Sequence, residues 1–239
     1  MSHPEVVAGL RAVRERIRSA ALGAGRDPAS VRLLAVSKRQ PVAALRAAYA
    51  EGQRDFGENY AQELLAKQAE LQDLPDLRWH MIGGVQRNKV AALTGTVSAV
   101  HSADSGRLIR ELGRRAALRP VPEGRRLRGT GQLLVFLEVN LAGEAQKVGC
   151  APEQLGELIT EVEKQAALAL GGLMIIPAGN GAPAASRQQF EALVALRERH
   201  GGVQRLPELS MGMSRDLEVA VACGSAWVRV GTDIFGART

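Results

Sequence analysis

Short apolar runs alternate with amphipathic stretches along the whole chain, and this alternation constrains the fold more than any other feature of the sequence. An apolar run of about four to eight residues between polar loops is typical of a buried strand, whereas the amphipathic stretches have helical spacing. Such alternation favours parallel strands joined by crossover helices. The expected strands cover residues 33–36, 54–57, 77–82, 97–101, 132–140, 168–174, 206–211 and 226–230, and the expected helices between them cover 42–50, 60–71, 86–93, 104–117, 152–165, 187–200 and 216–222.

The length of the chain decides between two arrangements of these units. Eight strands in 239 residues fit a closed (β/α)8 barrel of the TIM type better than an open, doubly wound sheet. No segment is long enough to be a linker, so we expect a single α/β domain over residues 1–239. A further helical pattern at 6–22, within about residues 4–24, precedes the first strand and is expected to pack on the barrel.

Nothing in the sequence indicates export or membrane insertion. The amino-terminal region lacks the apolar centre of a secretory signal, and no run approaches the roughly 18 apolar residues of a membrane span. The two cysteines, Cys150 and Cys223, are far apart and have no histidine at metal-binding spacing. We therefore expect a cytoplasmic protein without a membrane segment, and no metal site is indicated.

The basic composition leaves three explanations open. A net charge of +6 and a pI near 9.9 fit nucleic acid binding, an anionic small ligand, or an arginine-rich surface. Arginines cluster from Arg114 to Arg128, in a segment with Pro120 and Pro122 that we expect to be a solvated loop. Aromatic residues make up only 3% of the chain, and none interleave with these arginines as base-stacking platforms would. Nucleic acid is therefore the least favoured partner.

The first expected strand delivers a lysine to its carboxyl end. Residues 33–36 form a continuous apolar run, typical of a strand covered on both faces, and Lys38 follows just before Pro41 opens a helical pattern. Partial desolvation lowers the pKa of a lysine and makes it a nucleophile toward carbonyl compounds. Taken alone, this stretch is more often explained by a surface lysine that caps a strand end.

Functional residues of such barrels lie in the loops that follow the strands. Those positions include Lys38 after the first strand, Asn59 after the second and His80 near the end of the third. The loops after the last two strands contain hydroxyls and glycine-flanked backbone N–H groups, at residues 210–214 and 230–232. The pattern predicts one polar rim at the mouth of the barrel.

The last two loops predict a phosphate site. Barrels often bind phosphate after strands seven and eight, although Gly212 or Gly231 alone is equally consistent with an ordinary turn. Combined with Lys38 across the barrel mouth, these loops favour a ligand with a phosphate at one end and an aldehyde at the other. Pyridoxal 5′-phosphate (PLP) has that shape.

A series of motifs then identifies a resemblance. The chain is similar to the pyridoxal phosphate homeostasis protein family from about residue 4 to its carboxyl terminus. The motifs that carry the resemblance are AVSK (35–38), FGENY (56–60), WHMIG (79–83), QRNK (86–89), ExxKxG (144–149), GLM (172–174), LSMGMSRDLE (209–218) and VRVGTDIFGAR (228–238).

The resemblance implies a barrel like the amino-terminal domain of alanine racemase, with PLP held as a Schiff base on Lys38. It also implies that Arg229 faces the pyridine nitrogen and that Asn59 and His80 lie close to the cofactor. The phosphate would be held by Ser210 and by the backbone around Met211, Gly231 and Thr232. Lys89 and Lys147 match lysines that recur in the family, without an implied role.

A carrier and an enzyme are both consistent with PLP on a lysine. A racemase needs acid–base groups on both faces of the cofactor, and alanine racemases take the second from a tyrosine of another domain. This chain offers only Tyr49 and Tyr60, and packing is the commoner role for an aromatic residue at a helix start. If Arg229 faces the pyridine nitrogen, its permanent charge weakens the ring as an electron sink.

We therefore expect a non-catalytic PLP carrier with a role in intracellular vitamin B6 homeostasis. A PLP-dependent amino-acid racemase or lyase is the alternative, and a basic nucleic-acid-binding barrel is a weaker third hypothesis. The partners implied by the carrier role are PLP itself and PLP-dependent apo-enzymes that receive it. We expect a monomer, because no contiguous apolar stripe requires a partner.

Overall fold

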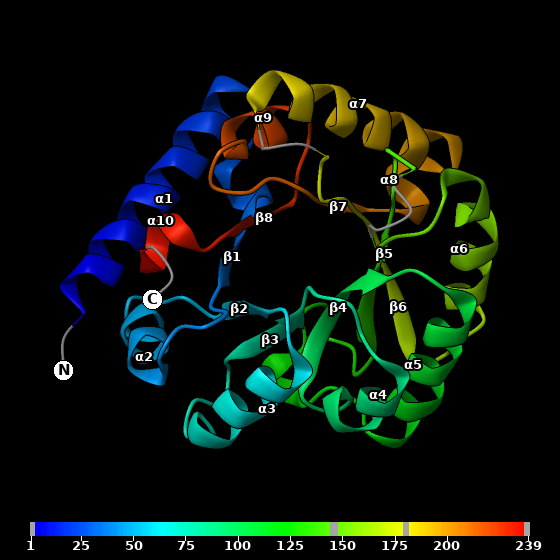
Figure 1. Ribbon diagram of the computed structural model, residues 1–239, viewed down its shortest axis with the longest axis horizontal. Helices are drawn as coiled ribbons and strands as arrows, with labels where there is room; N and C mark the ends of the chain where they lie inside the picture. Colours follow the sequence, from blue (N-terminus) through cyan, green and yellow to red (C-terminus); the bar gives the residue numbers. More distant parts are fainter. Residues whose placement is uncertain (1–2, 144–147, 179–181, 237–239) are drawn as a thin grey trace.

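The protein forms a closed barrel of eight parallel strands, ordered around the barrel as they occur along the chain (Figure 1). The computed structural model describes residues 3–143, 148–178 and 182–236. The predicted (β/α)8 barrel is confirmed, with strand ends that differ from expectation by a few residues. The strands are β1 (Arg32–Val36), β2 (Asp55–Glu58), β3 (Arg78–Met81), β4 (Val97–Ala103), β5 (Leu133–Glu138), β6 (Leu168–Met174), β7 (Glu208–Ser210) and β8 (Trp227–Val230).

Helices surround the barrel and return the chain to the amino-terminal end of each next strand (Figure 1). Burial along the strands explains this, because all eight strands are buried at most or all positions and need cover on both faces. The helices are α1 (Pro4–Gly23), α2 (Val42–Ala50), α3 (Ala61–Glu70), α4 (Arg87–Leu93), α5 (Gly106–Leu118), α6 (Leu155–Glu163), α7 (Pro183–Arg199), α8 (Gly202–Arg205), α9 (Leu217–Ala222) and α10 (Thr232–Phe235).

Three local expectations were wrong. Helix α7 begins at Pro183 rather than 187, because proline is well tolerated in the first helical turn, where its missing N–H removes no helical bond. The arginine-rich segment is not loop throughout, since Arg114 and Arg115 lie in α5 and both pair with Glu111. The loop expected after the last strand is reduced to Gly231, because β8 ends at Val230 and the short helix α10 starts at Thr232.

The amino-terminal helix α1 packs against α9 and α10, as expected for an added helix on a barrel (Figure 1). The approach to α10 is close, because a Cβ atom at Gly9 would lie 2.5 Å from the backbone oxygen of Asp233. Arg16 extends from the same helix and donates hydrogen bonds to Glu218, to Asp233 and to the backbone oxygen of Ser214. Helix α1 thus holds the loops that follow β7 and β8.

No described helix is both long enough and apolar enough to cross a membrane.

Candidate functional site

A cavity of about 410 Å³ opens at the carboxyl ends of the strands. Its walls come from loops that are far apart in the sequence, which the closed barrel brings to one rim. Lys38 lies on one side, and residues that follow β7 and β8 lie on the other. The lining residues are Val36, Lys38, Gln40, Asn59, Ile82, Ile176, Pro177, Met213, Ser214, Arg215, Asp216, Arg229, Gly231, Thr232 and Gly236.

A buried ion-pair network supports the strand end that carries Lys38. Lys67 of α3 donates hydrogen bonds to the backbone oxygen of Ser37 at 2.6 Å and to Glu58 Oε1 at 2.7 Å. Ser37 donates its hydroxyl proton to the same Glu58 oxygen at 2.7 Å. Burial raises the pKa of Glu58, while the hydrogen bond and charge of Lys67 lower it. Ser37, which precedes Lys38, is thereby held through both its hydroxyl and its backbone oxygen by two buried side chains.

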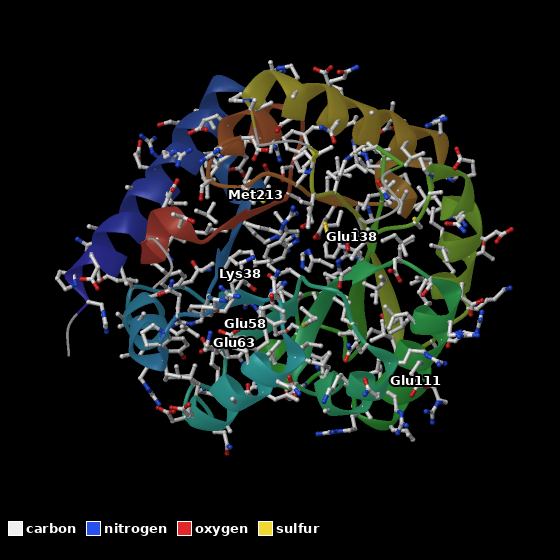
Figure 2. The ribbon with its side chains drawn as sticks, in the orientation of Figure 1. Lys38, Glu58, Glu63, Glu111, Glu138 and Met213 are labelled. Atoms are coloured by element: carbon white, nitrogen blue, oxygen red, sulfur yellow. The ribbon has the colours of Figure 1, made fainter. Side chains whose placement is uncertain are left out.

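The same network also fixes the backbone after Lys38. Glu63 accepts a hydrogen bond from Lys67 at 2.7 Å and another from the backbone N–H of Arg39. Arg39 has a φ of 60°, the left-handed conformation that few non-glycine residues adopt. In Figure 2, Lys38, Glu58 and Glu63 lie together where β1, β2 and α3 meet. The lysine is therefore presented by a constrained turn with a bond on each side of it.

The opposite wall is formed by the loops after β7 and β8. Asp216 accepts a hydrogen bond from the backbone N–H of Met213 at 2.6 Å and one from the Ser186 hydroxyl at 2.8 Å, which folds residues 213–216 into a tight turn. Gly212 has a φ of 95°, and a Cβ atom there would lie 2.4 Å from the Cβ of Ala220. Only glycine fits this position. The turn places Ser214 on the wall of the same cavity that Thr232 lines.

Arg229 contributes a buried positive charge to the cavity. Its side chain donates hydrogen bonds to Ser210 Oγ at 2.9 Å and to the backbone oxygen of Ile175 at 2.7 Å. Burial lowers the pKa of Arg229 to about 10, while the charges of Glu138 and Asp216 raise it. The guanidinium therefore stays charged at neutral pH and suits a ring nitrogen or an anionic group of a ligand.

Comparison with known proteins accounts for this arrangement. The family described as "Alanine racemase, N-terminal domain" matches residues 9–239. A pyridoxal phosphate homeostasis protein from Pseudomonas aeruginosa is 49% identical over 227 residues, which cover 95% of this chain and 93% of that protein. The chain belongs to the pyridoxal phosphate homeostasis proteins of the alanine racemase N-terminal domain family.

Two solved structures place the family in its wider fold. PipY of Synechococcus elongatus, solved with PLP bound, is 39% identical and has a TM-score of 0.77, over 94% of this chain and all of that one. An alanine racemase from Streptomyces coelicolor has a TM-score of 0.67 at 21% identity, over 97% of this chain but only 58% of the racemase. The second likeness shows the shared barrel alone.

In this homeostasis-family member, five of the eight sequence-predicted site residues line the 410 Å³ cavity. They are Lys38, Asn59, Arg229, Gly231 and Thr232. The other three, His80, Ser210 and Met211, are buried below it and are absent from its described lining. The sequence placed Ser214 in the loop predicted to bind phosphate, at residues 210–214, but the hydroxyl role was assigned to Ser210. Lys89 lies on α4 away from the cavity lining, and Lys147 and Glu144 lie outside the described residues.

A second cavity of about 310 Å³ adjoins the first and shares Asn59, Ile82 and Ile176 with it. Glu138 lies in its wall, on the side of the barrel away from Lys38 (Figure 2). Burial raises the pKa of Glu138 to about 7, although the charge of Arg229 lowers it. Sequence reasoning gave no role to this residue, because a glutamate at the end of an apolar strand is indistinguishable from a solvated one.

An unpaired oxygen in the cavity wall shows, independently of the comparisons, that the residues present fit a ligand such as PLP. Asn59 Oδ1 is buried and accepts no hydrogen bond from the described residues. An unpaired buried oxygen costs free energy unless a ligand or water pairs with it. Asn59 lines both cavities, so a hydroxyl or N–H group of a bound molecule would supply the donor that this oxygen lacks.

Proposed function

We propose that this chain binds PLP in the larger cavity, with Lys38 as its covalent attachment point, and takes part in intracellular PLP homeostasis as a carrier. The observation that carries the proposal is the placement of Lys38, Arg229 and Thr232 on the walls of one cavity. The 49% identity to a named homeostasis protein and the likeness to PLP-bound PipY support it.

The lining residues divide into three groups by the part of PLP that they suit. Ser214, Gly231 and Thr232 offer hydroxyl and backbone donors for the phosphate, so the hydroxyl role expected for Ser210 moves to Ser214. Arg229 suits the pyridine nitrogen, and Asn59 Oδ1 suits the ring hydroxyl. Bound PLP would supply an electrophilic carbon and an electron sink.

Two features favour a carrier over a racemase or lyase. The charge of Arg229 disfavours a second positive charge on the ring nitrogen, which weakens the electron sink. Tyr60 is 53% exposed at the start of α3 and is absent from the described cavity lining, so it does not supply an acid–base group there. We propose little or no turnover, with PLP-dependent apo-enzymes as recipients and a monomeric carrier.

Incubation of the PLP-loaded protein with a panel of L- and D-amino acids tests this proposal. The carrier role predicts that no racemised or decarboxylated product exceeds one equivalent per protein chain, as measured by chiral chromatography. Product that grows over many turnovers would establish the racemase or lyase instead.

Equilibrium dialysis tests the phosphate site. Thr232→Val and Ser214→Ala each remove one hydroxyl and should weaken PLP binding about tenfold or more, as expected for a charge-assisted hydrogen bond. Ser98→Ala is the matched control, because the Ser98 hydroxyl is buried in β4 and does not line the cavity. Unchanged affinity in both cavity variants would refute the phosphate assignment.

A further inference from the structure

The buried polar side chains below Arg229 form a continuous chain of hydrogen bonds through the barrel interior. We infer that Ser210, His101, His80 and Asp55 are positioning residues for Arg229, and that the two ends of the chain set the direction of every proton in it. The part of the inference that concerns the ligand group facing Arg229 rests on the proposed function. The direction of the protons along the chain is independent of the proposed function.

Four short contacts define the chain. Arg229 donates to Ser210 Oγ at 2.9 Å, and Ser210 Oγ lies 2.9 Å from His101 Nδ1. His101 Nε2 lies 3.0 Å from His80 Nδ1. His80 Nε2 lies 2.9 Å from Asp55 Oδ1. The contacts join β8, β7, β4, β3 and β2, so the chain crosses the barrel from its mouth to the start of β2.

The two ends of the chain differ in hydrogen-bonding role, since Arg229 is a donor and Asp55 is an acceptor. Arg229 has only N–H donors, so Ser210 Oγ must accept at that end. Burial raises the pKa of Asp55, but hydrogen bonds from Arg78 and His80 lower it to about 2. Asp55 is therefore an ionised acceptor, and His80 must donate to it through Nε2.

Only one arrangement of protons joins these ends when both imidazoles are neutral. His80 uses its single N–H toward Asp55, so its Nδ1 accepts from His101 Nε2. His101 Nδ1 then accepts the hydroxyl proton of Ser210, whose oxygen accepts from Arg229. Burial and the nearby positive charges lower the pKa of His101 well below its usual value, in keeping with a neutral ring. Each imidazole nitrogen thus has one partner, and the Ser210 hydroxyl has two, because it accepts from Arg229 and donates to His101.

Aromatic packing keeps the two rings in place. The His101 ring stacks on Phe136 with centroids 4.3 Å apart, and the His80 ring lies 4.9 Å from Trp227. Both imidazoles are fully buried, so water does not compete for their nitrogens. With its second bond to the backbone of Ile175, Arg229 has two fixed contacts that hold its guanidinium at the cavity wall.

Nitrogen-15 NMR of the PLP-free protein at pH 8 tests the direction of the chain. The sequence has only four histidines, so His80→Gln and His101→Gln assign the two buried rings. We expect both to carry the proton on Nε2. A proton on Nδ1 of either ring would overturn the inferred direction, whether or not the protein binds PLP.

PLP titration tests the positioning role. His101→Phe keeps a stacked ring but breaks the chain, and should weaken PLP binding at least about fivefold and shift its visible absorbance maximum. His101→Gln retains a donor and an acceptor and should recover part of both. Ser210→Ala breaks the chain beside Arg229 with a smaller change in side-chain size, which keeps the test valid if His101→Phe does not fold.

His200→Gln, at the C-cap of α7, is the matched control. Unchanged affinity and absorbance in both chain-breaking variants would overturn the positioning role.

Discussion

Replacement of Lys67 by methionine measures how strongly the buried network holds the Lys38 turn. Lys67 is 6% exposed and Glu58 is fully buried, so the variant leaves a carboxylate in the core without its cation. Removal of one partner of a buried ion pair costs about 3–5 kcal/mol. Methionine keeps most of the side-chain length, so little of the loss comes from packing. We expect Lys67→Met to lower the free energy of unfolding by about that amount.

The pH dependence of this loss identifies its source. Burial raises the pKa of Glu58, and without Lys67 the main opposing influence is gone. The folded variant then holds a proton on Glu58 at pH values where the unfolded chain has lost it. Its stability, relative to wild type, therefore falls as pH rises above the usual glutamate pKa of 4.5 toward neutrality. Glu58→Gln in the same background removes the charge and should restore part of the stability.

Urea unfolding followed by tryptophan fluorescence measures both effects, because Trp79 and Trp227 are fully buried reporters. Asp73→Asn is the matched control, since it breaks an ion pair with Arg46 in which the two side chains are 59% and 42% exposed. Such exposed pairs contribute at most about 1 kcal/mol. A Lys67→Met variant that loses no more stability than this control, with no pH dependence, would refute the reasoning.

Three further variants test the surroundings of the cavity. Gly9→Val forces a Cβ atom against the backbone of α10, so it should lower the free energy of unfolding by about 1–3 kcal/mol and weaken PLP binding. Gly23→Ala is the control, because Gly23 has open space around it, and it should change neither the stability in thermal melts nor the affinity in PLP titration. Arg16→Met removes the hydrogen bond to the Ser214 backbone and should weaken PLP binding severalfold in dialysis; unaltered binding would contradict that link. Folded Glu138 keeps its proton to about pH 7, whereas the unfolded chain loses it at lower pH. The stability of the wild type should therefore fall by up to about 3 kcal/mol from pH 4.5 to 7 relative to Glu138→Gln. The same pH dependence of stability in both proteins, measured by urea unfolding, would contradict this.

The sequence predicted the barrel because strand length, helix spacing and chain length agreed with one another. It predicted the position of Lys38 for the same reason, since a strand end in a barrel is also a position on the rim. Lys67 was not predicted, because a lysine on an amphipathic helix is ordinarily exposed, and only the tertiary fold brings it to Glu58.

Ser210 and His80 lie deeper in the barrel than the sequence predicted. Both were expected near the ligand, because each stands at or near the end of a strand. Side chains alternate between the two faces of a strand, so a shift of one residue in its end moves a side chain from the rim into the interior. Strand β7 ends at Ser210, whose hydroxyl points to His101, and Ser214 lines the cavity instead.

The proposed function requires PLP to be attached to Lys38. Reduction of the PLP-loaded protein with borohydride, followed by peptide mass mapping, locates the attachment directly. We expect the pyridoxyl group on the peptide that contains Lys38, together with loss of the visible absorbance band in Lys38→Ala. Attachment to another lysine, or a band that persists in Lys38→Ala, would contradict the account.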